Sequence, residues 1–175
     1  MTKSNMFKPI VVLTLICLVL SAILVETNSV TAPIIEASEL AAAEAARAEV
    51  LPEADSFTKV EGSFDERIIG VYKADNDAGY VVQVLEDGYG GKKTLSIMAG
   101  IDNDGLIVET KVLANNETPG LGSRIADNEF RGQFAGKDTS LEGIVTISGA
   151  TISSGHFIDA MKDAFAAFEI AKEAN

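Results

Sequence analysis

An uncharged apolar segment near the N-terminus most restricts how this chain can fold. From Ile10 to Val25, sixteen residues carry no charge, and twelve of them are Ile, Val or Leu. At about 1.5 Å per residue such a helix spans roughly 24 Å, and Met6 and Phe7 extend it toward the roughly 30 Å hydrocarbon core of a bilayer. Insertion of the twelve aliphatic side chains is favourable by roughly 4 to 7 kcal/mol. We therefore predict a transmembrane anchor over residues 1–26.

A cleaved signal peptide is the alternative interpretation of this segment, and it requires small residues before the cut. A cut after Ala22 leaves apolar residues on both sides, and only a cut after Ser29 meets the requirement tolerably. A retained anchor is therefore favoured. Lipid attachment at Cys17 is disfavoured, because Ile16 stands where a lipoprotein signal has a small residue.

The charges predict the orientation of the anchor. Residues 1–25 hold two lysines and no acid, and the rest of the chain holds all 26 acidic residues. Because positive flanks stay in the cytoplasm, we expect a single pass through the cytoplasmic (inner) membrane, with the N-terminus cytoplasmic and the C-terminal domain extracytoplasmic. The acidity of that domain disfavours nucleic acid and anionic bilayers as partners. Because Cys17 is the sole cysteine, disulfides and thiolate metal sites are excluded there.

Beyond the anchor, the sequence predicts a juxtamembrane helix and then a domain of mixed secondary structure. The juxtamembrane region, 27–52, is interrupted at Thr31–Pro33, is Ala- and Glu-rich from Ile34 to Leu51, and stops at Pro52. For residues 53–175 we expect an α+β fold, one mainly antiparallel sheet with helices packed against it. The expected strands are Ile68–Lys73, Gly79–Leu85, Thr94–Ile101, Leu106–Leu113 and Gly143–Ile147, and the expected helices are Asp127–Phe134 and Phe157–Lys172.

The domain is poor in groups that catalyse reactions by themselves. His156 is the only histidine, and the G-x-S-x-G pattern of a nucleophilic serine is absent. No His and carboxylate cluster has the spacing of a metal site, and no GxGxxG turn opens a helix. We therefore predict no catalytic residue and no metal, and we expect His156 to be a polar residue in the first turn of the last helix. Such a domain binds passively or takes its chemistry from a cofactor.

The segment 148–154, with the sequence SGATISS, is suited to holding a cofactor. It lies between an expected strand and an expected helix, where free N–H groups and the helix dipole favour a phosphate. Gly149 and Ala150 are small and allow a ligand to approach closely. Ser153 or Ser154 can cap the helix, and Thr151 has a hydroxyl that can form a phosphoester. A capping turn without a ligand is the plain alternative.

This segment resembles the flavinylation motif, small-Gly-Ala-Thr-x-Ser/Thr, of the FMN-binding domain family. The matching residues are Ser148, Gly149, Ala150 and Thr151, followed by Ser153 and Ser154. A second stretch, Glu117-Thr118-Pro119-Gly120-Leu121-Gly122, resembles another signature of the family, which lies close to the bound flavin. The resemblance implies FMN attached to Thr151 through a phosphoester by a separate flavin transferase that uses FAD. A purely structural loop is the alternative interpretation of 117–122.

Within this family, the short length and single anchor most resemble the G subunits of Rnf complexes, which are membrane-bound ion-translocating ferredoxin:NAD oxidoreductases. This resemblance implies an electron carrier that relays electrons through FMN between other membrane and peripheral subunits and catalyses nothing alone. The C subunits of sodium-pumping NADH:quinone reductases share the motif and are the alternative within the family. A pilin-like structural protein or a passive binding module is the alternative of another class, although a pilin has a glutamate early in its apolar run and here Glu26 follows it. The coupling ion, the flavin potential and the order of electron transfer stay open.

Overall fold

The structure is a computed structural model that describes residues 4–174 of the 175-residue chain, with side chains from Phe7 onward. The chain divides into two compact units that meet between Ala42 and Ala43. The first unit is helical, and the second contains the sheet and all remaining helices of the described residues.

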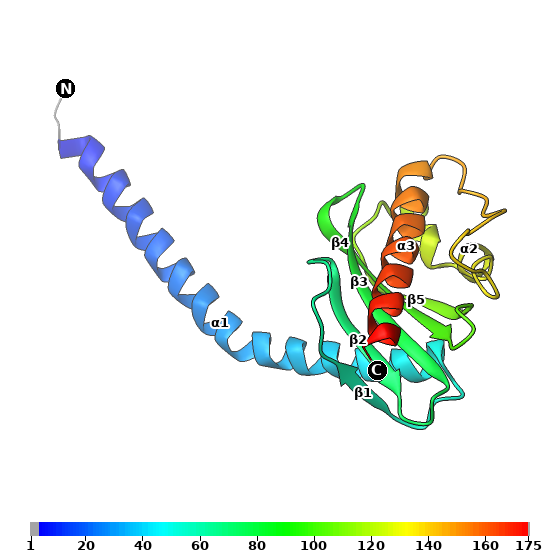
Figure 1. Cartoon of the computed structure of the whole chain (residues 1–175). Helices are drawn as coiled ribbons and strands as arrows, with labels where there is room; N and C mark the ends of the chain where they lie inside the picture. Colours follow the sequence, from blue (N-terminus) through cyan, green and yellow to red (C-terminus); the bar gives the residue numbers. More distant parts are fainter. Residues whose placement is uncertain (1–3, 175) are drawn as a thin grey trace. The chain divides into compact units, whose positions relative to one another are not determined.

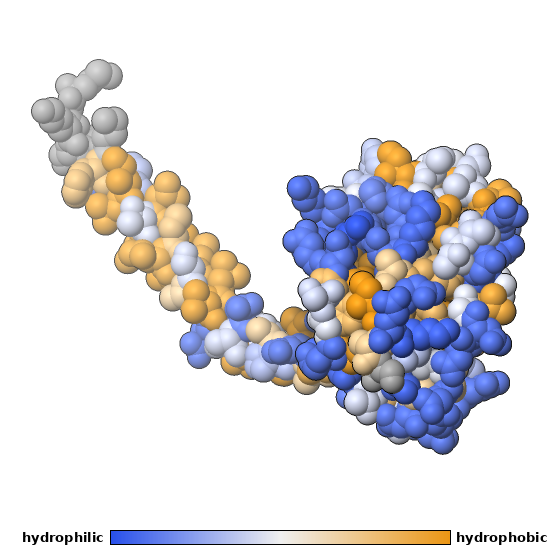
Figure 2. Space-filling view, viewed as in Figure 1, coloured by the Kyte–Doolittle hydropathy of each residue, from blue (hydrophilic) through white to orange (hydrophobic). Residues whose placement is uncertain are grey.

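A single helix makes up the first unit. Helix α1 runs from Ser4 to Val50 without a break, and its stretch from Phe7 is long and apolar enough to cross a membrane. The large apolar side chains between Phe7 and Val25 are exposed. Figure 2 shows the resulting hydrophobic surface along much of this helix. One apolar N-terminal helix of this kind fits a single-pass membrane protein.

The interruption predicted at Thr31–Pro33 is wrong, because α1 continues through Pro33. A proline inside a helix removes one backbone donor, here toward the carbonyl of Ser29. The neighbouring turns keep their bonds, and the Ala- and Glu-rich sequence that follows has high helix propensity. The predicted anchor and juxtamembrane helix are thus two stretches of one continuous helix, as Figure 1 shows.

The second unit is built on one antiparallel sheet whose strands follow one another in sequence order. The strands are β1 (Phe57–Val60), β2 (Ile68–Ala74), β3 (Gly79–Gly88), β4 (Gly91–Asp102) and β5 (Ile107–Asn115). Strands β2 to β5 confirm four of the predicted strands and the α+β class. Strand β1 was not predicted, because its four residues, two of them exposed and polar, show no alternation.

Helices complete this unit. They are the 3-10 helix η1 (Gly122–Ala126), the short α2 (Asn128–Arg131) and the terminal α3 (Thr151–Glu173). Helix α3 packs on β2, β3 and β4 (Figure 1). It buries the predicted apolar face, which consists of Phe157, Met161, Phe165 and Phe168. Helix α2 confirms the centre of the helix predicted at Asp127–Phe134.

The strand predicted at Gly143–Ile147 is wrong. Although the segment is apolar, its backbone groups pair with a side chain. Val145 donates its N–H to Oε1 of Gln133 at 2.9 Å, and its carbonyl accepts from Nε2 of Gln133 at 3.2 Å. At Val145 the Gln133 side chain thus supplies the partners that a neighbouring strand would supply, and the segment is a loop.

The sheet is buried on both faces, which gives the unit two apolar cores. The larger core lies between the sheet and α3. The second lies on the other face, where Ala43, Ala46 and Val50 of α1 and the following Leu51 pack with Ala74, Val81 and Met98. The last turns of α1 therefore bury apolar side chains within the globular unit.

Candidate functional site

A cleft of about 550 Å³ lies where three parts of the globular unit meet. These parts are the tip of the β3–β4 hairpin, the 117–122 turn before η1, and the start of α3. The lining residues are Tyr89, Glu117, Thr118, Leu121, Gly122, Gly149, Ala150, Thr151, Ile152 and Ser153. The volume is in the range of about 300–1,000 Å³ that is typical of small-molecule sites. The fold thus brings the two motif stretches, which are separate in sequence, to one cleft.

The cleft contains eight of the twelve predicted site residues, and the other four lie outside its lining. Ser148 lines a neighbouring cavity of about 410 Å³ together with Arg124. Ser154 is fully buried. Pro119 and Gly120 are exposed in the turn. The structure therefore brings eight of the predicted residues together in one cleft and places these four beside it.

Thr151 is the first residue of α3, and its side chain is exposed. The preceding Ala150 is the N-cap residue, and no side chain caps the helix. The first backbone N–H groups of an α-helix have no acceptor within the helix, and the positive end of the helix dipole lies there. The Thr151 hydroxyl thus lies beside free backbone donors that suit an anionic group.

The prediction that Ser153 or Ser154 caps the helix is wrong, because α3 begins before both of them. Their hydroxyls turn inward. Ser154 Oγ donates to the carbonyl of Ala150 at 2.9 Å and accepts the N–H of Ile147 at 3.0 Å. Ser153 Oγ donates to Oε2 of Glu117. These contacts attach the first turn of α3 to the preceding loop at Ile147 and to Glu117 of the cleft. The helix therefore begins six residues earlier than the predicted Phe157.

Glu117 is the most buried acid of the cleft, with 6% of its surface exposed. Its Oε1 accepts the backbone N–H of Tyr89 at 2.8 Å, and its Oε2 accepts the Ser153 hydroxyl. Its own N–H donates to Oδ1 of Asn115 at 2.9 Å, at the end of β5. One carboxylate therefore connects the hairpin tip, the 117–122 turn and α3.

Two glycines of the motifs are required by the local geometry. A Cβ on Gly122 would lie 2.5 Å from Oε2 of Glu117 and 2.7 Å from Oγ of Ser153, so any side chain there would separate these partners. Gly149 has φ of +81°, in the left-handed region that favours glycine. The first glycine permits close packing, and the second permits the turn into α3.

Two residues of the cleft were missed by the sequence analysis. Tyr89 is 68% exposed at the hairpin tip, and Ile152, at the variable position of the motif, is 55% exposed. With Leu121, which is also exposed, they give the cleft an apolar rim. The sequence gave little indication that these two residues line the cleft. An aromatic residue in a Gly-rich hairpin is common, and Ile152 stands at a position where the motif accepts any residue.

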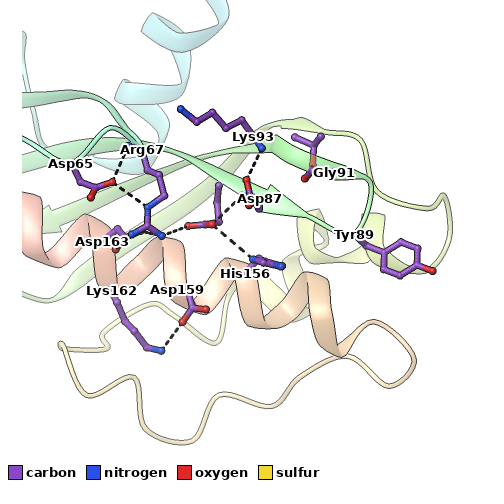
Figure 3. Close-up of polar contacts among 12 residues, drawn as sticks. Asp65, Arg67, Asp87, Tyr89, Gly91, Lys93, His156, Asp159, Lys162 and Asp163 are labelled. Atoms are coloured by element: carbon purple, nitrogen blue, oxygen red, sulfur yellow. Dashed lines mark hydrogen bonds and ion pairs between the residues drawn. The ribbon is translucent and has the colours of Figure 1, made fainter.

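A second polar cluster lies between α3 and the sheet (Figure 3). Arg67 Nη1 lies 3.1 Å from Oε2 of Glu86 and 2.9 Å from Oδ2 of Asp163, and its Nε lies 3.1 Å from Oδ1 of Asp65. Burial raises the pKa of Asp163, and the positive charge of Arg67 opposes this rise. Hydrogen bonds from Arg67 lower the pKa of Asp65.

His156 belongs to this cluster, and it lies in the second turn of α3, not in the first as expected, because the helix begins at Thr151. Its Nδ1 lies 3.8 Å from Oε1 of Glu86. Within residues 7–174 no three His, Cys, Asp or Glu side chains come together in a way that could hold a metal ion. The cluster is thus an ion-pair network between α3 and the sheet.

Comparison with known families defines the class of the domain. The family model described as FMN-binding domain matches residues 88–166. This range begins at the β3–β4 hairpin and ends within α3, so it includes every residue that lines the cleft. The cleft therefore belongs to an FMN-binding domain.

Three relatives extend the similarity to most of the chain. The chain is 35% identical to the G subunit of the ion-translocating oxidoreductase complex of Methanosarcina acetivorans, over 90% of this chain and 91% of the relative. It is 33% identical to the G subunit of the Na⁺-translocating ferredoxin:NAD⁺ oxidoreductase complex of Acetobacterium woodii, over 89% and 81%. It is 27% identical to the proton-translocating counterpart of Clostridium ljungdahlii, over 87% and 85%. The chain belongs to the family of G subunits of ion-translocating oxidoreductase complexes.

Proposed function

We propose that this chain is the electron-carrying flavoprotein subunit of a membrane-bound, Rnf-type ion-translocating ferredoxin:NAD oxidoreductase complex, and that it holds FMN through a phosphoester to Thr151. One observation carries the proposal: residues 117–122 and the SGATISS segment, far apart in sequence, form one cleft with the Thr151 side chain in its lining. Membership of the G-subunit family supports the assignment to such a complex.

The residues of the cleft fit FMN. The uncapped start of α3 favours the phosphate by about 0.3–1 kcal/mol, and the Thr151 hydroxyl is exposed beside it. The rim formed by Tyr89, Leu121 and Ile152 is suited to covering an aromatic ring system. Ser148, Gly149, Ala150 and Ser153 contact the phosphate or are recognised by the flavin transferase that attaches it, and Ser154 holds the turn.

The chemistry follows from what the cofactor supplies, which is transfer of one or two electrons at a time. A phosphoester to Thr151 prevents loss of the cofactor between the electron donor and the acceptor. The chain then passes electrons between other membrane and peripheral subunits and catalyses no reaction alone. Tyr89, Leu121 and Ile152 keep part of the ring from water, and Glu117, Thr118 and Gly122 of the 117–122 turn complete the lining on that side of α3.

We further propose that residues 1–26 span the cytoplasmic membrane, that 27–52 connect them to the domain, and that residues 53–175 form the extracytoplasmic domain, on which the last turns of α1 pack. The lysines before the apolar run favour a cytoplasmic N-terminus. Cys17 is the only cysteine and lies within the apolar run, so a cysteine introduced at exposed Ser140 can be labelled selectively. A membrane-impermeant maleimide should label the Ser140→Cys chain in intact cells, and labelling only after lysis would reverse the orientation.

The attachment site is tested by intact mass and peptide mapping of the chain co-expressed with its flavin transferase. We expect a mass increase of one FMN less one water, localised to Thr151. The Thr151→Val chain should fold and carry no covalent flavin. Thr139→Val is the matched control, since Thr139 is an exposed threonine that does not line the cleft and should leave attachment intact. A Thr151→Val chain that keeps its covalent flavin, or unmodified Thr151 in the native host, would refute the proposal.

A further inference from the structure

Glu117 stands out in the cleft because its contacts connect walls that belong to different elements. We propose that Glu117 is a positioning residue that fixes Thr151 relative to the hairpin tip, and that its buried negative charge lowers the reduction potential of the flavin. This inference rests on the proposed function, and it assigns Glu117 a role through Ser153 and Tyr89.

The positioning role follows from the hydrogen bonds. The carboxylate accepts the hydroxyl of Ser153, which lies two residues after Thr151 in the first turn of α3. Its other oxygen accepts the N–H of Tyr89 at the hairpin tip. Asn115 holds the backbone of Glu117 and also donates to the carbonyl of Ser123 at 3.3 Å, so the carboxylate is fixed to the end of β5. The attachment residue therefore has a fixed place relative to the rim.

Two glycines next to Glu117 leave the space that its carboxylate occupies. A Cβ on Gly88 would lie 2.1 Å from Oε1 of Glu117, and a Cβ on Gly122 would lie 2.5 Å from Oε2. Two glycines thus face the two oxygens from different segments. A bulkier residue at either position would push the carboxylate out of its hydrogen bonds.

The electrostatic role follows from burial. Glu117 lines the cleft, and both of its oxygens act as acceptors in the contacts above. A negative charge that is shielded from water acts strongly over short distances, because the effective dielectric constant is low. An added electron on a neighbouring flavin is disfavoured by this charge, so Glu117 shifts the potential downward. A neutral side chain of equal shape removes this effect.

The test compares Glu117→Gln and Glu117→Ala with the wild-type full-length chain, each co-expressed with the flavin transferase and purified in detergent. Two quantities are measured: the fraction of chains with FMN on Thr151, by intact mass, and the midpoint potential of the attached flavin. Glu142→Gln is the control, because it removes one negative charge from an exposed residue that does not line the cleft.

Glutamine keeps an acceptor for Tyr89 and a polar group for Ser153, so we expect near wild-type attachment with a potential shifted upward. Alanine leaves both donors unpaired, so attachment should fall several-fold. Glu142→Gln should leave both quantities unchanged. A wild-type potential in Glu117→Gln overturns the electrostatic role, and wild-type attachment in Glu117→Ala overturns the positioning role. Wild-type chain without flavin refutes the proposed function as well, so the two failures are distinguishable.

Discussion

Gly122 lies against the two side chains that connect the walls of the cleft. In Gly122→Ala the added Cβ would meet Glu117 at 2.5 Å and Ser153 at 2.7 Å, and the residue is buried. Overpacking of this kind costs about 1–3 kcal/mol. We expect the free energy of unfolding to fall by that amount in urea titrations of the detergent-solubilised chain, and flavin attachment to fall with it.

Gly155 provides the matched control for this substitution. It lies within α3, and a Cβ there would have nothing within 4 Å. Alanine in a helix interior is favoured over glycine by roughly 0.5–1 kcal/mol. Gly155→Ala should therefore raise the free energy of unfolding and leave attachment at Thr151 unchanged. Equal destabilisation by both substitutions would contradict the steric explanation for Gly122.

At the scale of elements, Arg67 joins the sheet to α3. It precedes β2, and its guanidinium binds Glu86 of β3 and Asp163 of α3. Glu86 is only 5% exposed, so loss of its partner is costly. Arg67→Met keeps the aliphatic stem and removes the charge. We expect the unfolding free energy to fall by about 1–2 kcal/mol at neutral pH. This loss is smaller than that for a fully buried ion pair, because the Arg67 side chain is 37% exposed and water screens its charge.

The pH dependence of this loss has a definite sign. The pKa of Asp163 is raised above its ordinary 3.8 by burial, so its ionised form destabilises the fold above that raised pKa, and the penalty disappears as pH falls toward 3.8. Arg67 reduces the penalty. It also lowers the pKa of Asp65, a contribution that is present above pH 3.8 and is lost as pH falls through the lowered pKa.

The difference in unfolding free energy between wild type and Arg67→Met should therefore be largest at neutral pH and should decrease on acidification. Urea unfolding at several pH values measures it. Lys162→Met is the control, because Lys162 pairs at 2.7 Å with an exposed Asp159 and contributes little. A difference that is constant with pH would contradict the electrostatic origin.

The sequence predicted those elements in which local pattern and tertiary packing agree. Strands β2 to β5 contain runs of aliphatic and β-branched residues and are separated by turn residues, and α3 has an apolar face. Residues 143–147 have the same composition as a strand, but Gln133 occupies the backbone N–H and carbonyl of Val145, and Ser154 occupies the N–H of Ile147. The first turn of α3 contains Thr, Ser and Gly, which are poor helix formers, and it is held by the contacts of Ser153 and Ser154.

The site was predictable to the extent that it is encoded in short motifs. The resemblance gave both stretches, and the structure places most of their residues in one cleft. The Ser153 hydroxyl points inward because it donates to the Glu117 carboxylate. The two residues are 36 positions apart, and no local sequence pattern specifies such a contact. Tyr89 enters the cleft because the hairpin between β3 and β4 ends there.

At the scale of the whole molecule, the end of α1 is a structural part of the globular unit. Ala43, Ala46, Val50 and Leu51 are at most 9% exposed and are four of the seven buried residues of the second core. Burial of Val and Leu contributes roughly 1.5–3 kcal/mol each, so their loss together with the two alanines costs roughly 4–7 kcal/mol. That is comparable to the total stability of a domain, about 5–15 kcal/mol.

A soluble fragment of residues 40–175 should therefore fold cooperatively, whereas a fragment of residues 53–175 should have a much lower urea midpoint and should associate through the exposed Val81 and Met98. Urea unfolding and size-exclusion chromatography of both fragments measure this difference. Equal stability would show that the domain begins at the predicted boundary, Glu53, without help from α1.

Gly100 on β4 shows whether α1 itself causes the difference. A Cβ on Gly100 would lie 2.1 Å from the carbonyl oxygen of Val50, which is backbone and has little freedom to move. Gly100→Ala should thus destabilise the 40–175 fragment by about 1–3 kcal/mol, since the helix end must shift away from the sheet. In the 53–175 fragment the same methyl group meets no helix, so the substitution should be close to neutral. If Gly100→Ala destabilises both fragments equally, the clash lies within the sheet, and the last turns of α1 do not pack on it as the structure describes.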